Sequence, residues 1–248
     1  ADSGNWMDAI DLGARVMDVL YDIRRAKRPV LVYGWGVHLA EAEEDAERFA
    51  HELKIPVLTT WAARDLMPSD PLNFGAFGTH GTRAANFVVQ NADLLLTVGT
   101  RLDTKATGTP KEYFARGAKI IMVDIDRHEI DKFKARVEGI QADAKEFLDM
   151  AARAAMVSKF PDFRLWVARC KSWQTRYPQV TQADTLESRV NPYYFMQILS
   201  QCMDRDATVV SDTGCALAWA MQGLEFKGQR FIHAFNMTPM GYGLPAAL

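Results

Sequence analysis

Short apolar runs recur along the first 150 residues of the chain, and a stretch with helical spacing follows each of them. The runs lie at residues 29–33, 55–59, 93–98, 119–124 and 137–140. Strands that are apolar on both faces are typical of a parallel sheet, because helices cover both sides of such a sheet. The alternation therefore predicts a doubly wound, mainly parallel α/β domain of the Rossmann-like kind.

The helical segments of this region carry the charge pattern of surface helices. We interpret residues 39–53 as one amphipathic helix, whose solvated face carries Glu41, Glu43, Glu44, Asp45 and Glu47. A further helix is predicted over residues 6–26, ahead of the first strand. Its C-terminus is marked by cations, which suit that end of a helix, and by a proline, which stops it: Arg24, Arg25, Lys27 and Pro29.

The character of the chain changes after Asp143. A long helical region covers residues 144–177 with a break at Pro161, and a polar stretch follows it. We predict a central FAD/nucleotide-binding-like domain at 1–159 and an interdomain linker at 160–190.

Residues 191–248 are predicted to begin a second α/β domain. A helix through Met203 precedes a strand at 207–211, and a helix to about Gly223 precedes a strand at 231–234. Two strands cannot bury a sheet on both faces, so we expect this second domain to be incomplete.

Composition excludes several classes of protein. The chain has 29 Lys and Arg against 31 Asp and Glu, a net charge of −2, so no uniform positive field favours nucleic acid or an anionic membrane as a partner. Three cysteines are too few for a disulfide framework or a thiolate metal site, which favours a reducing, cytoplasmic setting. No apolar run approaches the ~20 residues that span a bilayer.

Glycine-rich loops follow the predicted strands, at the edge where open parallel sheets bind ligands. Gly34-Trp35-Gly36 could bind a phosphate through its N–H groups or form a tight structural turn; the third glycine of the dinucleotide fingerprint is absent. Gly78-Thr79-His80-Gly81 also permits close backbone approach to a ligand. Its alternative interpretation is that His80 is a satisfied polar residue of a turn.

Charged residues lie in the next two loops at this edge. Arg101 with Lys105 could neutralise a diphosphate, and the alternative is a surface salt bridge between Arg101 and Asp103. Asp124-Ile125-Asp126 ends a predicted strand. An acid there could accept a hydrogen bond from ribose hydroxyls, or it could cap the helix that begins near His128.

A last group of loop residues lies in the second domain. Asp212-Thr213-Gly214 follows a strand, and a glycine-rich segment at 236–245 follows the next strand. Two successive strand exits of this kind suggest one lip of a cleft that binds a phosphate-bearing ligand.

Taken in order, these stretches resemble the thiamine-diphosphate-dependent enzymes of the acetolactate synthase/pyruvate oxidase type over nearly all 248 residues. The resemblance rests on Phe77-Gly78-Thr79-His80-Gly81 with Asn86, Val98-Gly99-Thr100-Arg101-Leu102-Asp103, Val123-Asp124-Ile125-Asp126 and Met240-Gly241-Tyr242-Gly243-Leu244-Pro245. It implies a 2-oxo-acid decarboxylase or carboligase, acetolactate synthase-like, that uses thiamine diphosphate and Mg²⁺.

The resemblance also implies roles for residues of the second domain. Met240 matches the apolar side chain wedged between the two rings of the bent coenzyme, and the Thr238 carbonyl would accept from the coenzyme's amino group. A thioether suits a wedge because it is apolar and polarizable, although a methionine in an apolar segment is more simply a core residue. The loop that grips the diphosphate matches Asp212, Thr213, Gly214, Cys215 and Ala216, with Gly241 nearby; acetolactate synthases usually carry Gln-His where this chain has Cys215-Ala216.

For the central domain the resemblance implies FAD, with ADP or no ligand as alternatives found in related decarboxylases. The matching positions are Gly34, Trp35, Gly36, Thr59, Thr60, Gly78, Thr79, His80, Gly81, Gly99, Thr100, Arg101, Asp103, Lys105, Asp124, Ile125, Asp143 and Ala144. Lys105 replaces the family's usual arginine, so a bidentate grip on the diphosphate becomes a point charge.

Two elements of the family's reaction centre are not found in these residues. They are a glutamate from a preceding domain and the Gly-Asp-Gly…Asn signature that binds Mg²⁺, so no metal ligand is predicted here. We expect a segment of a longer chain, inactive alone, that acts on a 2-oxo acid such as pyruvate in a homodimer or homotetramer. The alternatives are a non-catalytic module that binds FAD, ADP or NAD, and a scaffold domain.

Overall fold

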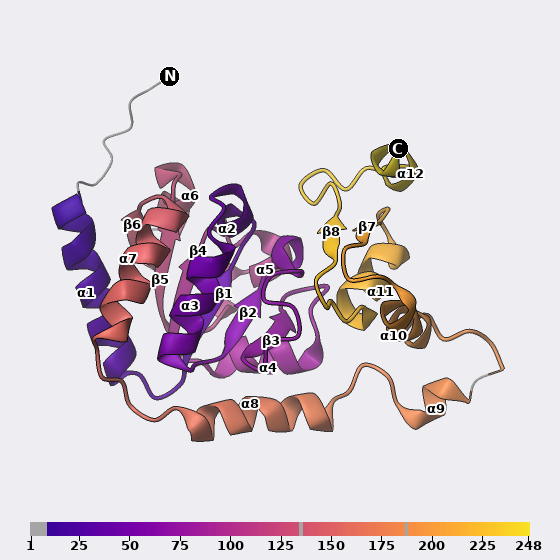
Figure 1. Ribbon diagram of the computed structural model, residues 1–248, viewed down its shortest axis with the longest axis horizontal. Helices are drawn as coiled ribbons and strands as arrows, with labels where there is room; N and C mark the ends of the chain where they lie inside the picture. The colour runs from indigo at the N-terminus through magenta and orange to yellow at the C-terminus, as the bar shows by residue number, and fades with distance from the viewer. Residues whose placement is uncertain (1–8, 134–135, 187) are drawn as a thin grey trace.

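Two parallel sheets organise the chain, which the computed structural model describes for residues 9–133, 136–186 and 188–248 (Figure 1). The first sheet has six strands: β1 (Pro29–Tyr33), β2 (Val57–Thr59), β3 (Asn73–Ala76), β4 (Leu94–Val98), β5 (Lys119–Asp124) and β6 (Glu138–Gln141). The second has two: β7 (Thr208–Val210) and β8 (Arg230–Ile232).

Helices connect these strands. Those of the first part are α1 (Ala9–Arg25), α2 (Gly36–Leu39), α3 (Glu43–Leu53), η1 (Trp61–Ala63), α4 (Arg83–Asn91), α5 (Thr104–Thr107), η2 (Lys111–Tyr113), α6 (Arg127–Asp131) and α7 (Ala144–Met156). The remaining helices are α8 (Arg164–Arg176), α9 (Gln182–Thr185), α10 (Pro192–Cys202), α11 (Cys215–Gly223) and α12 (Gly243–Ala247).

The six strands run parallel in the order β3-β2-β1-β4-β5-β6, which confirms the predicted doubly wound, Rossmann-like fold. The five predicted strands are all present, and β1 and β5 have the predicted bounds. The order reverses between β1 and β4, where such sheets open a crevice for ligands.

The sequence did not predict β3. Its four residues, Asn73–Ala76, form no continuous apolar run, and Gly75 has a φ of 88°. The strand lies at the edge of the sheet, where pairing to β2 alone positions it and where a weak apolar pattern is tolerated.

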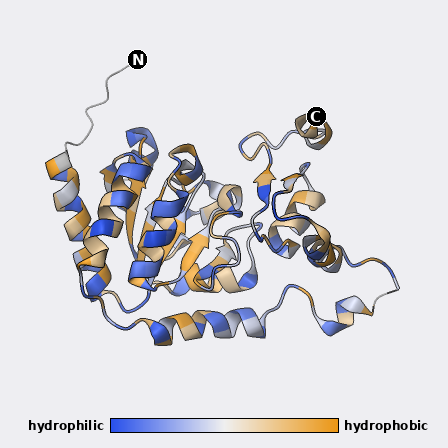
Figure 2. Ribbon diagram, viewed as in Figure 1, coloured by the Kyte–Doolittle hydropathy of each residue, from blue (hydrophilic) through white to orange (hydrophobic). Residues whose placement is uncertain are grey.

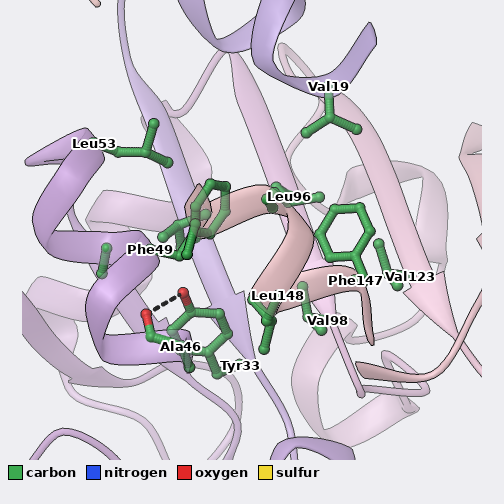
Figure 3. Close-up of a cluster of buried hydrophobic side chains, with 14 of the residues drawn as sticks. Val19, Tyr33, Ala46, Phe49, Leu53, Leu96, Val98, Val123, Phe147 and Leu148 are labelled. Atoms are coloured by element: carbon green, nitrogen blue, oxygen red, sulfur yellow. Dashed lines mark hydrogen bonds between the residues drawn. The ribbon is translucent and has the colours of Figure 1, made fainter. Parts of the chain in front are cut away.

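Helices cover both faces of the first sheet. On one face, Val19 of α1, Phe49 of α3 and Phe147 of α7 pack over Leu96 and Val123 (Figure 3). On the other face, residues of α4 and α8 pack over β4 and β5. Figure 2 shows hydrophobic strands behind helices whose outer surfaces carry hydrophilic residues. The pattern explains why the strands are apolar throughout.

The prediction of one helix over residues 39–53 is wrong. Helix α2 ends at Leu39 and α3 begins at Glu43. Glu41 between them has a φ of 51°, a left-handed conformation that interrupts a right-handed helix. The acidic residues of this region lie partly in the first turn of α3, where negative charge is favourable. For the predicted helix 6–26, the described part is α1, and residues 6–8 lie outside the described residues.

The predicted break near Pro161 is confirmed, because α7 ends at Met156 and α8 begins at Arg164. Helix α8 lies against the first sheet and along its lower edge in Figure 1. The Trp166 indole donates to the Pro29 carbonyl (3.0 Å), and Cys170 is fully buried. The first part of the range predicted as a linker is therefore packed on the central domain.

Both predicted strands of the second domain are present, and β7 pairs with β8 in parallel. Its apolar core contains Leu217, Met221, Phe226 and Phe231, and it also includes Trp61 from the first part of the chain. The two parts are thus in direct contact. Within the described ranges no helix has the length and hydropathy needed to cross a membrane.

Candidate functional site

A cleft of about 500 Å³ opens at the carboxyl ends of the central strands. The loops that follow β1, β2, β4, β5 and β6 line it, at the point where the strand order reverses. Phe235 and Asn236, from the loop after β8, line its opposite side. The cleft therefore lies between the central sheet and the second part of the chain.

Eleven of the residues predicted to bind a nucleotide line this cleft. They are Trp35, Gly36, Thr60, Gly99, Thr100, Arg101, Asp103, Asp124, Ile125, Asp143 and Ala144. They come from loops far apart in the sequence, and the parallel sheet brings them together because its carboxyl strand ends meet at one edge.

Seven other predicted residues do not line the cleft. They are Gly34, Thr59, Gly78, Thr79, His80, Gly81 and Lys105. Thr59 is fully buried within β2, and its hydroxyl has no hydrogen-bond partner in the described part of the chain.

The first glycine loop is packed against the protein itself. Gly34 N–H donates to Val98 O (3.0 Å), and Gly36 N–H donates to Gly99 O (2.9 Å). A Cβ on Gly34 would lie 2.2 Å from Gly99 O, so only glycine allows these two loops to approach. Of the two interpretations of this motif, the geometry supports a tight structural turn for its N–H groups.

The Gly78–Gly81 loop also uses its N–H groups internally. Gly78 donates to the Asn86 side chain (2.9 Å), Thr79 to Lys105 O (2.8 Å) and Gly81 to Gly78 O (3.0 Å). The His80 ring stacks on Trp61, with centroids 5.2 Å apart and planes 11° from parallel. Burial, together with the nearby charges of Lys105 and His233, lowers the pKa of His80. The loop itself does not line the cleft, but it contacts two residues that do, Trp61 and Ala106.

Carboxylates gather where β5 and β6 end. Asp124 is 8% exposed, and its Oδ1 accepts from Asp126 N (2.9 Å). Burial, followed by the charges of Glu129 and Asp126, raises the pKa of Asp124. Asp126 accepts from His128 N, which confirms the predicted cap of the helix near His128, and this bond lowers the pKa of Asp126. Asp124 lines the cleft, and a carboxylate there can accept hydrogen bonds from hydroxyl groups.

Arg101 does not pair with Asp103 within the described ranges; Asp103 instead caps α5 by accepting from Lys105 N and Ala106 N. The Arg101 guanidinium donates to Asn236 Oδ1 (2.6 Å) across the mouth of the cleft. The alternative interpretation, a salt bridge between Arg101 and Asp103, is therefore wrong, and Arg101 links the central domain to the loop after β8.

That loop presents the predicted wedge residue. Met240 is 90% exposed in the chain described, and it lies outside the apolar core of the second part. Asp212, which follows β7, contacts this loop, because its carboxylate accepts from the backbone N–H groups of Thr213, Gly241 and Gly243. Thr238 has a φ of 44°, which is rare for a β-branched residue.

The N-terminus of α11 begins at Cys215, directly after Gly214. Its N-cap is Gly214, which has no side chain that could cap the helix. A Cβ on Gly214 would meet no atom within 4 Å, so open space lies beside the loop. Uncapped N–H groups of a helix carry partial positive charge and suit a phosphate group. The diphosphate site expected at residues 213–215 stays a prediction, and the Thr213 N–H already donates to Asp212 Oδ1 (2.7 Å).

Sequence reasoning missed a buried polar network that joins the two parts. His38 Nε2 lies 2.9 Å from Asp65 Oδ1, and His38 Nδ1 lies 2.7 Å from Glu43 Oε1. Asp65 Oδ2 accepts from Phe231 N of β8 (3.0 Å), and the Asp65 side chain is 1% exposed. No local spacing links these residues, so only the fold could place them together.

Arg64 forms a second polar link. Its guanidinium donates to Met221 O (3.4 Å) and Leu224 O (3.2 Å) at the C-terminal end of α11. Burial lowers the pKa of Arg64 to about 10. A cation at a helix C-terminus is favourable, so Arg64 fastens the loop after β2 to the second part.

Comparison with known proteins gives a consistent picture. Residues 16–151 match the family described as thiamine pyrophosphate enzyme, central domain. The acetolactate synthase large subunit of Corynebacterium glutamicum is 36% identical over 230 residues, which are 91% of this chain and 36% of that protein. Acetolactate synthase isozyme 1 large subunit of Escherichia coli K12 is 34% identical over 237 residues, 94% of this chain and 40% of that protein.

A probable acetolactate synthase large subunit of Methanocaldococcus jannaschii is 32% identical over 91% of this chain and 39% of its own length. The chain thus spans well under half the length of these relatives. The family match covers more than half of the chain, and its range contains all six strands of the central sheet. The chain belongs to the thiamine pyrophosphate enzyme family, and residues 16–151 are its central domain.

Proposed function

We propose that this chain is part of a thiamine-diphosphate-dependent carboligase or decarboxylase of 2-oxo acids, similar to an acetolactate synthase large subunit. The observation that carries the proposal is the exposed Met240, held in a turn beside the uncapped N-terminus of α11. Relatives named as acetolactate synthases, which match over about nine-tenths of the chain, support it.

The residues present fit the two parts of the coenzyme: N–H groups suit its diphosphate, and an apolar side chain suits its rings. The N–H groups at Gly214 and Cys215 would hold the diphosphate, with space beside Gly214 for it. The Met240 side chain would support the rings, and the Thr238 carbonyl would accept from the amino group. When bound, thiamine diphosphate would supply a nucleophilic carbon and a cationic thiazolium ring that takes up the electron pair left by decarboxylation. The chain's own residues bind and orient the coenzyme; Mg²⁺, if used, would take its ligands from other residues.

For the cleft of the central domain we propose a nucleotide, with FAD as the family's implied ligand. Asp124 offers an acceptor to ribose hydroxyls, and Arg101 lies at the mouth with a positive charge. The residues of the Gly78–Gly81 loop, however, do not line the cleft. Their absence from the lining favours the nucleoside diphosphate portion as the part that the cleft holds, and it is compatible with ADP as well as FAD.

A non-catalytic nucleotide-binding module is the second candidate function. The cleft at the strand-order reversal supports it independently of Met240. We also propose that the central domain includes α8, that the interdomain link begins after Arg176, and that the protein forms a homodimer or homotetramer.

The test uses the full-length protein. We expect thiamine diphosphate to bind and CO₂ to be released from pyruvate or another small 2-oxo acid. Met240→Ala should lower the rate of release strongly, while Met156→Ala, an exposed methionine of α7, should not. Absence of CO₂ release from every small 2-oxo acid tried would contradict the proposal. A flavin absorption band in the purified protein, and calorimetry with ADP and NAD, test the cleft separately.

A further inference from the structure

A single carboxylate attaches the turn that carries Met240 to the end of β7. Asp212 Oδ1 accepts from Thr213 N (2.7 Å) and from Gly241 N (3.1 Å), and Oδ2 accepts from Gly243 N (3.0 Å). Gly241 and Gly243 lie 29 and 31 residues further along the chain. Gly241 is also the residue directly after Met240. Asp212 therefore fixes the backbone on one side of the wedge residue.

Neighbouring contacts make this attachment tight. A Cβ on Gly243 would lie 3.1 Å from Asp212 N, so the two segments touch. Tyr242, between the two N–H donors, packs edge-to-face on His233 with ring centroids 5.8 Å apart. His233 is 6% exposed, and its Nδ1–H donates to Ser211 O (2.8 Å). The turn is thus fastened to the residues that follow both β7 and β8.

On the N-terminal side of Met240, backbone hydrogen bonds hold the turn. Met237 N and Thr238 N both donate to Ala234 O, at 3.2 Å and 2.8 Å. The backbone around Met240 is therefore held on both sides, while the Met240 side chain is 90% exposed. A fixed backbone beneath an exposed side chain is the arrangement expected of a residue that is pre-organised to meet a ligand.

We propose that Asp212 is a positioning residue, which orients Met240 toward the coenzyme, and not a ligand of the diphosphate. The inference rests on the proposed function and changes the role that the sequence pattern suggested for Asp212. Both carboxylate oxygens are already used by backbone N–H groups, and a free carboxylate beside a diphosphate would repel it.

Backbone N–H groups stabilise the negative charge of Asp212. Hydrogen bonds from Gly243 N and Thr213 N hold the pKa of Asp212 below its ordinary value. The carboxylate is therefore ionised at neutral pH, and the turn keeps its acceptor over the range in which the enzyme would work.

Asp212→Asn is the sharpest variant, because it preserves the shape and replaces one acceptor oxygen with an NH₂ group that cannot accept. We expect thiamine diphosphate to bind about tenfold more weakly or worse to the full-length variant. Hydrogen exchange in the peptide that covers residues 236–248 should become faster. The near-ultraviolet circular dichroism of the bound coenzyme should change even at saturation, which a loss of stability elsewhere would not cause.

Two further variants serve as controls. Asp206→Asn makes the same chemical change at an exposed residue before β7 and should behave as wild type. Asp212→Glu keeps the charge but moves the carboxylate by one methylene group. It should not restore wild-type binding if position is what matters, and full restoration would overturn the inference.

The outcomes separate this inference from the proposed function. A wild-type protein that does not bind thiamine diphosphate contradicts both. Wild-type binding with an unaffected Asp212→Asn variant, in affinity or in exchange, overturns the positioning role alone. Weaker binding and faster exchange together, with an unchanged Asp206→Asn control, support it.

Discussion

The two sheets of this chain bury their strands to very different extents. Every residue of β1 and β4 is buried, whereas β7 has one exposed and two half-buried residues and β8 has exposed residues on both sides of Phe231. Helices cover both faces of the first sheet and provide it with its own core. The core of the second part includes Trp61, which the first part supplies. The central domain therefore has a complete apolar core of its own, whereas the second part needs its contact with the central domain to complete its core.

The contact between the two parts also completes one side of the candidate cleft. Phe235 and Asn236 of the second part line a cleft that is otherwise built from the central domain. A change that loosens the contact should therefore affect the cleft without unfolding the central sheet.

Phe147→Ala should have the largest effect. Phe147 is fully buried between α7 and the sheet, and removing its ring leaves a cavity in the core of the central domain (Figure 3). We expect the free energy of unfolding to fall by about 3–5 kcal/mol, measured by urea unfolding of the chain. Leu165→Ala, at a residue of α8 that is 88% exposed, is the control and should change little. A loss below about 1 kcal/mol for Phe147→Ala would contradict a self-sufficient core.

Asp65→Ala should release the second part while the central domain stays folded. The change leaves His38 and Phe231 N–H without their buried carboxylate. Loss of one partner in a buried polar network costs about 3 kcal/mol. We expect faster proteolysis between residues 177 and 191, with little loss of helical circular dichroism. Asp204→Ala, at an exposed residue, serves as the control. Simultaneous loss of both parts would argue against separate stabilities.

Thr238→Gly should stabilise the second part slightly. Thr238 has a φ of 44°, and a left-handed conformation costs an L-residue about 1–2 kcal/mol, while glycine in the unfolded chain loses more entropy on folding. The expected net gain is about 0.5 kcal/mol in the free energy of unfolding. Thr175→Gly, in the helical α8, should destabilise instead. Equal effects at the two sites would show that the backbone at Thr238 is not strained.

Asp124→Asn should have the smallest effect on stability and the opposite dependence on pH from most acids. Burial raises the pKa of Asp124, so the protonated form favours folding and its contribution is lost as the pH rises through the folded pKa. Relative to the variant, the wild type should gain stability as the pH falls from 7 toward 4, by less than about 1 kcal/mol.

Asp126→Asn is the matched control for this prediction, because hydrogen bonding to His128 N lowers the pKa of Asp126. Its stabilising contribution is present at neutral pH and is lost as the pH falls through the folded pKa. Urea unfolding at pH 7 and at mildly acidic pH would measure both variants. The same sign of pH dependence in the two variants would contradict the environments described for these neighbouring carboxylates.

Much of the central domain could be predicted from the sequence. The five apolar runs correspond to strands, and the doubly wound fold and the helix break near Pro161 are confirmed. The edge strand β3 could not be predicted, because its four residues, Asn73–Ala76, form no continuous apolar run and its place depends on pairing with β2. The single helix over residues 39–53 failed because periodicity continues across Glu41, while the backbone there turns left-handed.

Some features of the candidate site could be predicted from the sequence, and others could not. Loop position predicted that Gly99, Thr100 and Asp124 would meet at the sheet's carboxyl edge, since parallel strands place their ends together. The pattern could not tell whether the N–H groups of Gly34 and Gly36 face a ligand, because they donate to the carbonyls of Val98, at the end of β4, and Gly99. The partner of Arg101 is likewise Asn236, 135 residues away.

By itself, the sequence determined the strand runs, the helix faces, the loops at the carboxyl edge and the family resemblance, because these depend on local spacing and composition. Only the tertiary structure decided that Trp61 completes the second core, that Asp65 joins His38 to β8, and that Asp212 holds the turn of Met240. The physical reason is that such contacts join groups separated by tens to hundreds of residues. No local pattern records a hydrogen bond whose two ends meet only after the chain has folded.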